Sequence, residues 1–165
     1  MLIGGVEPAD LKIGGQLFFY RHILDIFNKI EGESLLGYVK HKGNRGNDTV
    51  AIAVECGSHF QSNSKYCARK TVIRFLQAYH IVTLVDIPGP KGFSMSRYRV
   101  IKTILPKHHD FKWAQAWSGF QAVKKGTVLA TESNTEIIVD DDYVLLMPTA
   151  NPVPGGDGVY LAKAV

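Results

Sequence analysis

The feature that most constrains this chain is an uninterrupted apolar run, Thr49–Val54, which ends in an acid. Glu55 follows the run directly, and Cys56 and Gly57 come next. A strand without alternating polar residues predicts that both of its faces are covered, as in a parallel or mixed sheet flanked by helices. Ligands of α/β sheets bind at the carboxyl ends of the strands. Glu55 is therefore the leading candidate for a catalytic residue.

The composition is that of an ordinary globular protein with a sizeable core. Of its 165 residues, 45% are hydrophobic and 21% are charged. The net charge is +4, but the basic residues are dispersed and form no run with interleaved aromatic residues. We therefore expect no nucleic-acid partner. No apolar run reaches the roughly 18 residues of a membrane span, so we expect no membrane association and a cytoplasmic location.

The two cysteines, Cys56 and Cys67, are too few for a disulfide framework and lack the spacing of a zinc knuckle. Both lie in or near apolar runs. We interpret them as free, buried thiols of a protein in a reducing compartment.

The first half of the chain, residues 1–92, has the pattern of an α/β domain. The opening Leu2–Gly5 resembles a strand, and apolar residues at helical spacing predict a helix over Gln16–Ile30. A loop rich in Gly and Asn then precedes the run that ends at Glu55. A second helix is expected to begin at Ser62 or Ser64 and to reach about Tyr79. The cluster Pro88–Gly92 marks the boundary of this domain.

The second half, residues 93–165, changes to β patterning and predicts a small β-domain. A hairpin is expected in which Glu136–Val139 pairs with Tyr143–Met147 around the acidic turn Asp140–Asp142. A calcium loop is the alternative for that turn, but the spaced ligands of such a loop are missing. The remaining strands are expected at Arg97–Leu105, Thr127–Thr131 and Val159–Ala162.

Two blocks of sequence resemble the succinylglutamate desuccinylase/aspartoacylase family, which are zinc-dependent amidohydrolases related to the metallocarboxypeptidases. The first block is Ala53-Val-Glu-Cys-Gly-Ser-His-Phe60, followed by the helical segment Val72–Leu76. It is similar to the strand end "V-E-C-G-x-H" of the family. The second block is similar to the family's carboxyl-terminal β-domain and comprises Phe120–Gly126, Leu129-Ala130, Val144–Pro148 and Val159–Ala162.

The resemblance implies a fold, an activity and a set of site residues. The fold would be α/β followed by β, with a partial metallocarboxypeptidase-like sheet domain and a carboxyl-terminal β-domain. The activity would be zinc-dependent hydrolysis of the amide bond of an N-acyl amino acid or a similar small acyl substrate. Glu55 would be the general base, and a strand-end carboxylate that is partly desolvated suits that task. Arg45, His59 and Tyr160 would contact the substrate.

Each of these residues also has a simpler interpretation. Glu55 could cap the next helix or pair with a lysine, Arg45 and His59 could be solvated, and Tyr160 could pack in the last strand. The family's zinc-ligand motif "G-x-H-G-N-E" is not found in the sequence. We therefore expect the carboxyl-terminal portion of such an enzyme, inactive alone, which needs either a homo-oligomer or an amino-terminal half. The alternative is a non-catalytic remnant or a binding module that completes a site on another chain.

Overall fold

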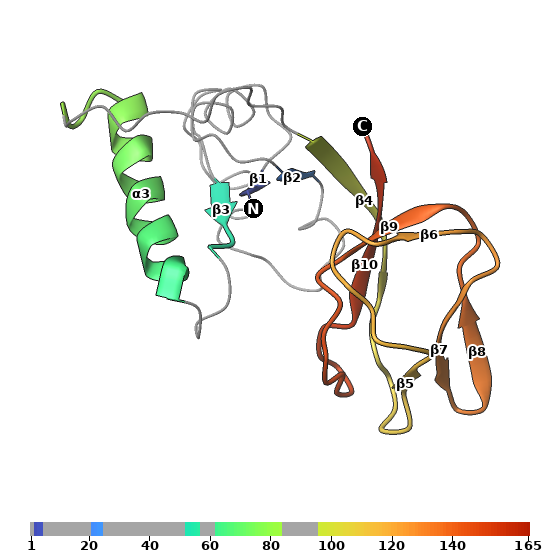
Figure 1. Cartoon of the computed structure of the whole chain (residues 1–165). Coiled ribbons are helices and arrows are strands. Elements are labelled where there is room, and N and C mark those ends of the chain that lie inside the picture. The colour runs from blue at the N-terminus through green and yellow to red at the C-terminus, as the bar shows by residue number, and fades with distance from the viewer. Residues whose placement is uncertain (1, 5–20, 25–51, 57–61, 84–95) are drawn as a thin grey trace, which may run out of the picture. The chain divides into compact units, whose positions relative to one another are not determined.

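Strands predominate in the computed structural model, which describes residues 2–4, 21–24, 52–56, 62–83 and 96–165. The chain divides into two compact units, Met1–Tyr98 and Arg99–Val165 (Figure 1). The described residues form β-strands and one helix, and none of their helices is long and apolar enough to cross a membrane. The predicted boundary at Pro88–Gly92 lies outside the described residues.

The first unit contains three short strands of a mixed sheet. Strand β1 (Leu2–Gly4) lies between the other two and pairs in parallel with β2 (Arg21–Leu24). It pairs antiparallel with β3 (Ile52–Val54), where Leu2 lies opposite Val54. The prediction of a strand ending at Glu55 within a mixed sheet is therefore confirmed. The three residues of β3 are half-buried.

The helix predicted over Gln16–Ile30 is wrong where the structure describes it, because Arg21–Leu24 is strand β2. Ile23, at the centre of this strand, is completely buried. The helical spacing of apolar residues around Ile23 was misleading because a short apolar segment fits either period. Pairing with β1 decides the conformation of these four residues.

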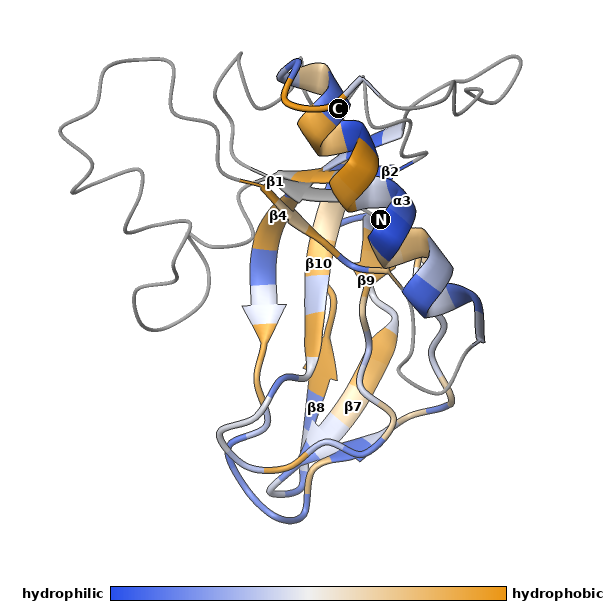
Figure 2. Ribbon diagram, turned by 90° about the vertical axis from the view of Figure 1, so that its left-hand side faces the viewer, coloured by the Kyte–Doolittle hydropathy of each residue, from blue (hydrophilic) through white to orange (hydrophobic). Residues whose placement is uncertain are grey.

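Helix α3 (Ser62–Ala78) confirms the second predicted helix. It carries both polar and apolar residues, and none of its residues is fully buried (Figure 2). The helix ends in a Schellman motif, in which His80 adopts a φ of 56°. The His80 N–H donates to the Gln77 carbonyl and the Ile81 N–H to the Leu76 carbonyl, both at 2.9 Å.

The second unit contains two sheets. One has the order β4-β10-β9-β6 and consists of β4 (Ser96–Ile104), β10 (Val159–Ala164), β9 (Tyr143–Leu146) and β6 (Ala122–Val123). The other has the order β5-β7-β8 and consists of β5 (Lys112–Trp113), β7 (Val128–Glu132) and β8 (Thr135–Ile138). The predicted strands at 97–105, 127–131 and 159–162 are thus confirmed to within a few residues.

The predicted hairpin around Asp140–Asp142 is wrong. Strand β8 pairs with β7, whereas β9 pairs with β10 and β6, so the acidic run connects two different sheets. The true hairpin turns at Ser133 and Asn134, whose φ angles are 49° and 59°. Two consecutive residues with positive φ form the type I′ turn that matches the twist of paired strands.

Seven buried residues from both sheets form the core of the second unit. A β-bulge in β7 allows the neighbours Leu129 and Ala130 both to be buried. Trp113 and Trp117 pack against this core cluster, and each indole N–H donates to a backbone carbonyl, of Thr149 and Leu129 respectively. The core cluster consists of Val123, Leu129, Val139, Tyr143, Leu145, Val159 and Leu161.

The core cluster predicts where the second unit is most sensitive to truncation. Leu145 is completely buried, so Leu145→Ala should lower the free energy of unfolding by about 2–5 kcal/mol. Ile138 is 52% exposed, so Ile138→Ala should change it by less than about 0.5 kcal/mol. Trp113 and Trp117 are the two tryptophans of the chain, so tryptophan fluorescence during urea unfolding reports on this unit. Equal effects of the two substitutions would contradict the assigned core.

Candidate functional site

Glu55 lies immediately after β3, at the carboxyl end of that strand, as predicted. Its side chain is exposed, so the described residues do not shield the Glu55 carboxylate from water as the sequence led us to expect. The antiparallel pairing of β3 with β1 fixes the backbone just before it, because Val54 lies opposite Leu2. The position of Glu55 is therefore set by the sheet, and its side chain is accessible to water.

Cys56 follows Glu55 directly and is the last residue that the structure describes at this end of β3. The Cys56 thiol is half-buried and lies 3.8 Å from the Val54 carbonyl oxygen. Burial raises the pKa of the Cys56 thiol, and the neighbouring Cys67 raises it further. The thiol of Cys56 therefore stays protonated near neutral pH.

Two of the predicted substrate-binding residues, Arg45 and His59, lie outside the described residues. The structure therefore leaves both assignments as predictions. Among the predicted site residues, the structure describes Glu55 in the first unit and Tyr160 in the second.

Tyr160 is buried within β10, with 4% of its surface exposed. Its hydroxyl lies 3.3 Å from Oδ1 of Asp157 and donates a hydrogen bond to it. Burial raises the pKa of Tyr160 to about 12, and the negative charge of Asp157 adds to the shift. The phenol is therefore neutral and already has an acceptor. Sequence reasoning missed this partner, although an aspartate three residues before the tyrosine in a glycine-rich loop was a usable signal.

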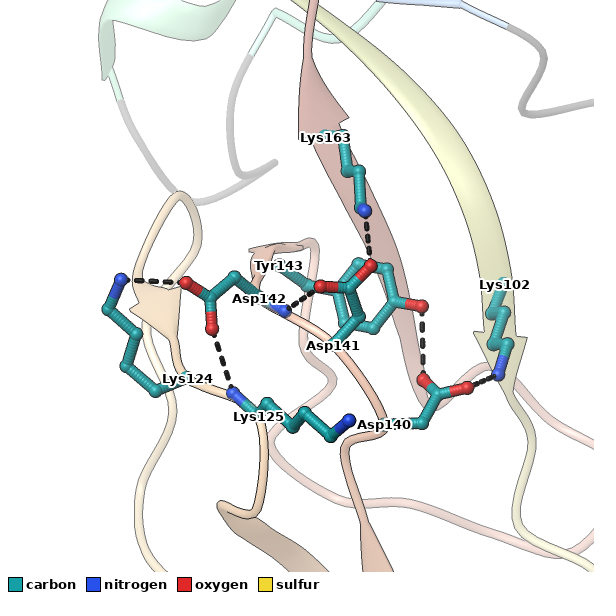
Figure 3. A network of polar contacts seen from close by, with 8 residues as sticks. All are labelled: Lys102, Lys124, Lys125, Asp140, Asp141, Asp142, Tyr143 and Lys163. Atoms are coloured by element: carbon teal, nitrogen blue, oxygen red, sulfur yellow. Dashed lines mark hydrogen bonds and ion pairs between the residues drawn. The ribbon is translucent and has the colours of Figure 1, made fainter.

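The acidic run Asp140–Asp142 is an ion-pair network (Figure 3). Asp140 pairs with Lys102 of β4, and Asp141 pairs with Lys163 of β10. Asp142 lies 2.7 Å from Nζ of Lys124, which directly follows β6. Each carboxylate is thus matched by one lysine from a different strand or its end, and this arrangement explains the run without a calcium ion.

Further hydrogen bonds fix the acidic run in place. The Tyr143 hydroxyl donates to Asp140 at 3.0 Å, and the Lys125 N–H donates to Asp142 at 2.9 Å. These contacts lower the pKa of all three aspartates, chiefly through the hydrogen bond from the paired lysine. Because all three carboxylates are at the surface, each pair contributes modestly to stability.

The part of the chain that the structure describes contains no set of ligands for the zinc that the resemblance implies. No group of three or more His, Cys, Asp or Glu side chains converges among those residues. Zinc sites in proteins take at least three protein ligands. The described residues alone therefore do not fit a zinc ion.

Comparison of the fold with solved structures identifies consistent neighbours, all at low sequence identity. Succinylglutamate desuccinylase from Vibrio cholerae matches with a TM-score of 0.67 at 12% identity, covering 98% of this chain and 48% of that one. Succinylglutamate desuccinylase/aspartoacylase from Rhodobacter sphaeroides matches with a TM-score of 0.65 at 10% identity, covering 99% of this chain and 53% of that one. The product-bound ectoine utilization protein EutE (DoeB) from Ruegeria pomeroyi matches with a TM-score of 0.68 at 11% identity, covering 100% of this chain and 53% of that one.

The comparisons confirm the predicted resemblance at the level of the fold. The chain spans about half the length of these structures, which is consistent with the expected carboxyl-terminal portion. The fold it shares with them consists, in the residues described, of β-sheets and one helix. No protein-family model matches the sequence, and no curated protein matches it.

The ion-pair network predicts acid sensitivity of the second unit. The aspartates have lowered pKa values in the fold, so their contribution is present above the unfolded-state pKa of about 3.9 and is lost as the pH falls through the lower folded values. Urea unfolding at low salt, followed by tryptophan fluorescence, should show a lower midpoint at pH 2 than at pH 6.

A matched pair of variants isolates the network from other acid effects. The variant carrying Asp140→Asn, Asp141→Asn and Asp142→Asn should lose part of this pH dependence. Glu136→Gln, at an exposed carboxylate of β8, should retain it. An identical pH dependence in the triple variant and the wild type would show that the network does not stabilise the fold.

Proposed function

We propose that this chain belongs to a hydrolase of the succinylglutamate desuccinylase/aspartoacylase type, which cleaves the amide bond of an N-acyl amino acid or a similar small acyl substrate. The observation that carries the proposal is the match of nearly the whole chain to such structures, with Glu55 at the end of a sheet strand. The metallocarboxypeptidase-like character of the first unit and the cytoplasmic location belong to the same proposal.

Glu55 is proposed as the general base and acid. Its carboxylate takes a proton from a water molecule as the water oxygen bonds to the amide carbonyl carbon. It then returns that proton to the amide nitrogen as the carbon–nitrogen bond breaks, so that a carboxylic acid and an amine leave. Exposure of Glu55 allows water to reach it, and a base that is correctly positioned contributes about 10²–10⁴-fold to the rate.

The substrate would be held by residues on either side of Glu55 in sequence. Arg45 is proposed to bind a substrate carboxylate, because a guanidinium pairs with a carboxylate through two parallel hydrogen bonds. His59 would line the same site. Tyr160 is the third proposed contact, and it would have to share its hydroxyl, which already donates to Asp157, by accepting a hydrogen bond from the substrate.

Zinc remains part of the proposal only through residues beyond those described. Its ligands would come from the rest of this chain, from a second copy in a homo-oligomer, or from an amino-terminal half. Zinc supplies a Lewis acid in hydrolysis when it is bound.

A binding module is the second candidate function. The exposure of the Glu55 side chain favours it, because catalytic sites are commonly concave and exclude water from the reacting groups. In this case the β-sheets of the second unit would complete or gate a site on another chain. The chain itself would then bind an acyl substrate or a partner without hydrolysing anything.

Substitution of Glu55 tests the hydrolase proposal. The protein is expressed with a tag in its native host, so that any partner chain is retained, and hydrolysis of N-succinylglutamate and other N-acyl amino acids is measured as amine release. Glu55→Gln should lower kcat by about 10²–10⁴-fold. Glu136→Gln, a matched exposed carboxylate on β8, should leave kcat unchanged. Equal activity of the two variants would remove Glu55 from the mechanism.

Metal content separates the two candidate functions. We expect the purified 165-residue chain alone to hold less than one zinc per chain by elemental analysis after dialysis, and the protein retained with its partners to hold about one zinc per active site. One tightly held zinc in the chain alone would contradict the binding module. Zinc-free protein from the native host would contradict zinc-dependent hydrolysis.

A further inference from the structure

Helix α3 carries basic residues without any acidic residue to balance them. It contains Lys65, Arg69, Lys70 and Arg74, and neither Asp nor Glu. Lys65 and Arg69 are four residues apart, as are Lys70 and Arg74, and like charges at this spacing repel each other. Lys65 also lies in the first turn, where the positive end of the helix dipole opposes a cation. An anionic partner would offset both unfavourable interactions.

The structure separates these four residues into two rows with different surroundings. Lys70 and Arg74 are half-buried, and Nζ of Lys70 lies 5.8 Å from the centroid of the Tyr66 ring, in a cation–π contact. Lys65 and Arg69 are exposed. The repulsion between Lys65 and Arg69 is therefore at the surface, where a ligand from solution can neutralise it.

Exposed apolar residues continue the row of Lys65 and Arg69 toward the other end of the helix. Val72 follows Lys65 by seven residues and Tyr79 follows Val72 by seven, so all lie on one side of the helix. Val72 is 58% exposed and Tyr79 is 40% exposed. The Tyr79 ring lies 5.0 Å from the ring of half-buried Phe75, which orients it. Lys65, Arg69, Val72 and Tyr79 are here called the α3 stripe.

We propose that the α3 stripe binds an acidic amphipathic helix of another polypeptide. Carboxylates at one end of that helix pair with Lys65 and Arg69, and apolar side chains at its other end pack on Val72 and Tyr79. A helix fits because its side chains repeat at the same spacing as the stripe. From Lys65 to Tyr79 the stripe extends about 21 Å, so the partner needs about four helical turns.

The charges of the stripe disfavour two other occupants. The α3 helix of a second copy would bring further basic residues and no carboxylate to the contact, so Lys65 and Arg69 would be desolvated without a counter-ion. A helix that lies on a membrane surface carries its apolar and basic residues on different faces. The α3 stripe instead places them on one face, at opposite ends, so that burying Val72 and Tyr79 in lipid would not leave Lys65 and Arg69 in water.

Binding of two synthetic peptides tests the proposal without any measurement of activity. Both are fluorescently labelled helical peptides of about 18 residues and identical composition. In the stripe peptide, glutamates and leucines occupy one face, with the glutamates at one end and the leucines at the other. In the scrambled peptide, the same residues are distributed around the helix. Fluorescence anisotropy with the full 165-residue chain should show that the stripe peptide binds at least about tenfold more tightly.

Three single variants separate the stripe from general charge attraction. Lys65→Glu should weaken binding of the stripe peptide at least about tenfold, and an acid in the first turn favours the helix, so the loss does not come from unfolding of α3. Val72→Ser should also weaken binding, because it removes the apolar contact while leaving the charge unchanged. Lys112→Glu makes the same change of charge at an exposed lysine of β5 and should leave binding unchanged.

Four outcomes would overturn the proposal. Equal affinity for the two peptides, or an equal loss in Lys65→Glu and Lys112→Glu, would show attraction by net charge alone. Absence of binding to both peptides would show that another segment of this chain covers the stripe. Binding of the chain to vesicles of phosphatidylcholine and phosphatidylserine that Lys65→Glu abolishes would make the occupant a membrane. A dimer in sedimentation that Lys65→Glu dissociates would make it a second copy.

Discussion

The second unit depends on the buried core cluster, in which residues from four strands and one connection exclude water together. Leu145 and Leu161 lie opposite each other on β9 and β10, and Leu129 reaches them from the other sheet through the bulge in β7. Burying an apolar side chain of this size stabilises a fold by about 1.5–3 kcal/mol. The ion pairs of the acidic run lie at the surface, so they hold the strand ends in register around a core that already provides most of the stability.

The strands of the second unit could be predicted because their apolar runs are bounded by turn residues. The neighbour with which each strand pairs could not be predicted. Asp140–Asp142 is a good turn sequence, but it connects two sheets, and each of its carboxylates pairs with a lysine in another strand or at a strand end. Ser133 and Asn134 form the hairpin turn through positive φ angles that neither residue type demands. In the first unit, Arg21–Leu24 has a helical pattern, and only pairing with β1 makes it a strand. Local patterns therefore predicted the elements better than their pairing.

In the candidate site, too, a local feature could be predicted from the sequence, whereas side-chain contacts could not. Glu55 could be placed from sequence because a strand end is a local feature, and the match to desuccinylase structures agrees with the fold in which such a residue was expected. The hydrogen bond from Tyr160 to Asp157 was not predicted, because side-chain contacts depend on how a loop returns toward the strand. Such contacts are set by tertiary packing.

The place of β10 in its sheet has a consequence for biosynthesis. This strand lies between β4 and β9 and supplies Val159 and Leu161 to the core cluster, yet it is made after every other strand of the unit. While the ribosome is still extending the chain, β4 and β9 lack their common neighbour and expose unpaired backbone edges and apolar side chains. Nascent chains of this kind are prone to aggregate. The second unit can therefore close only after β10 has left the ribosomal tunnel.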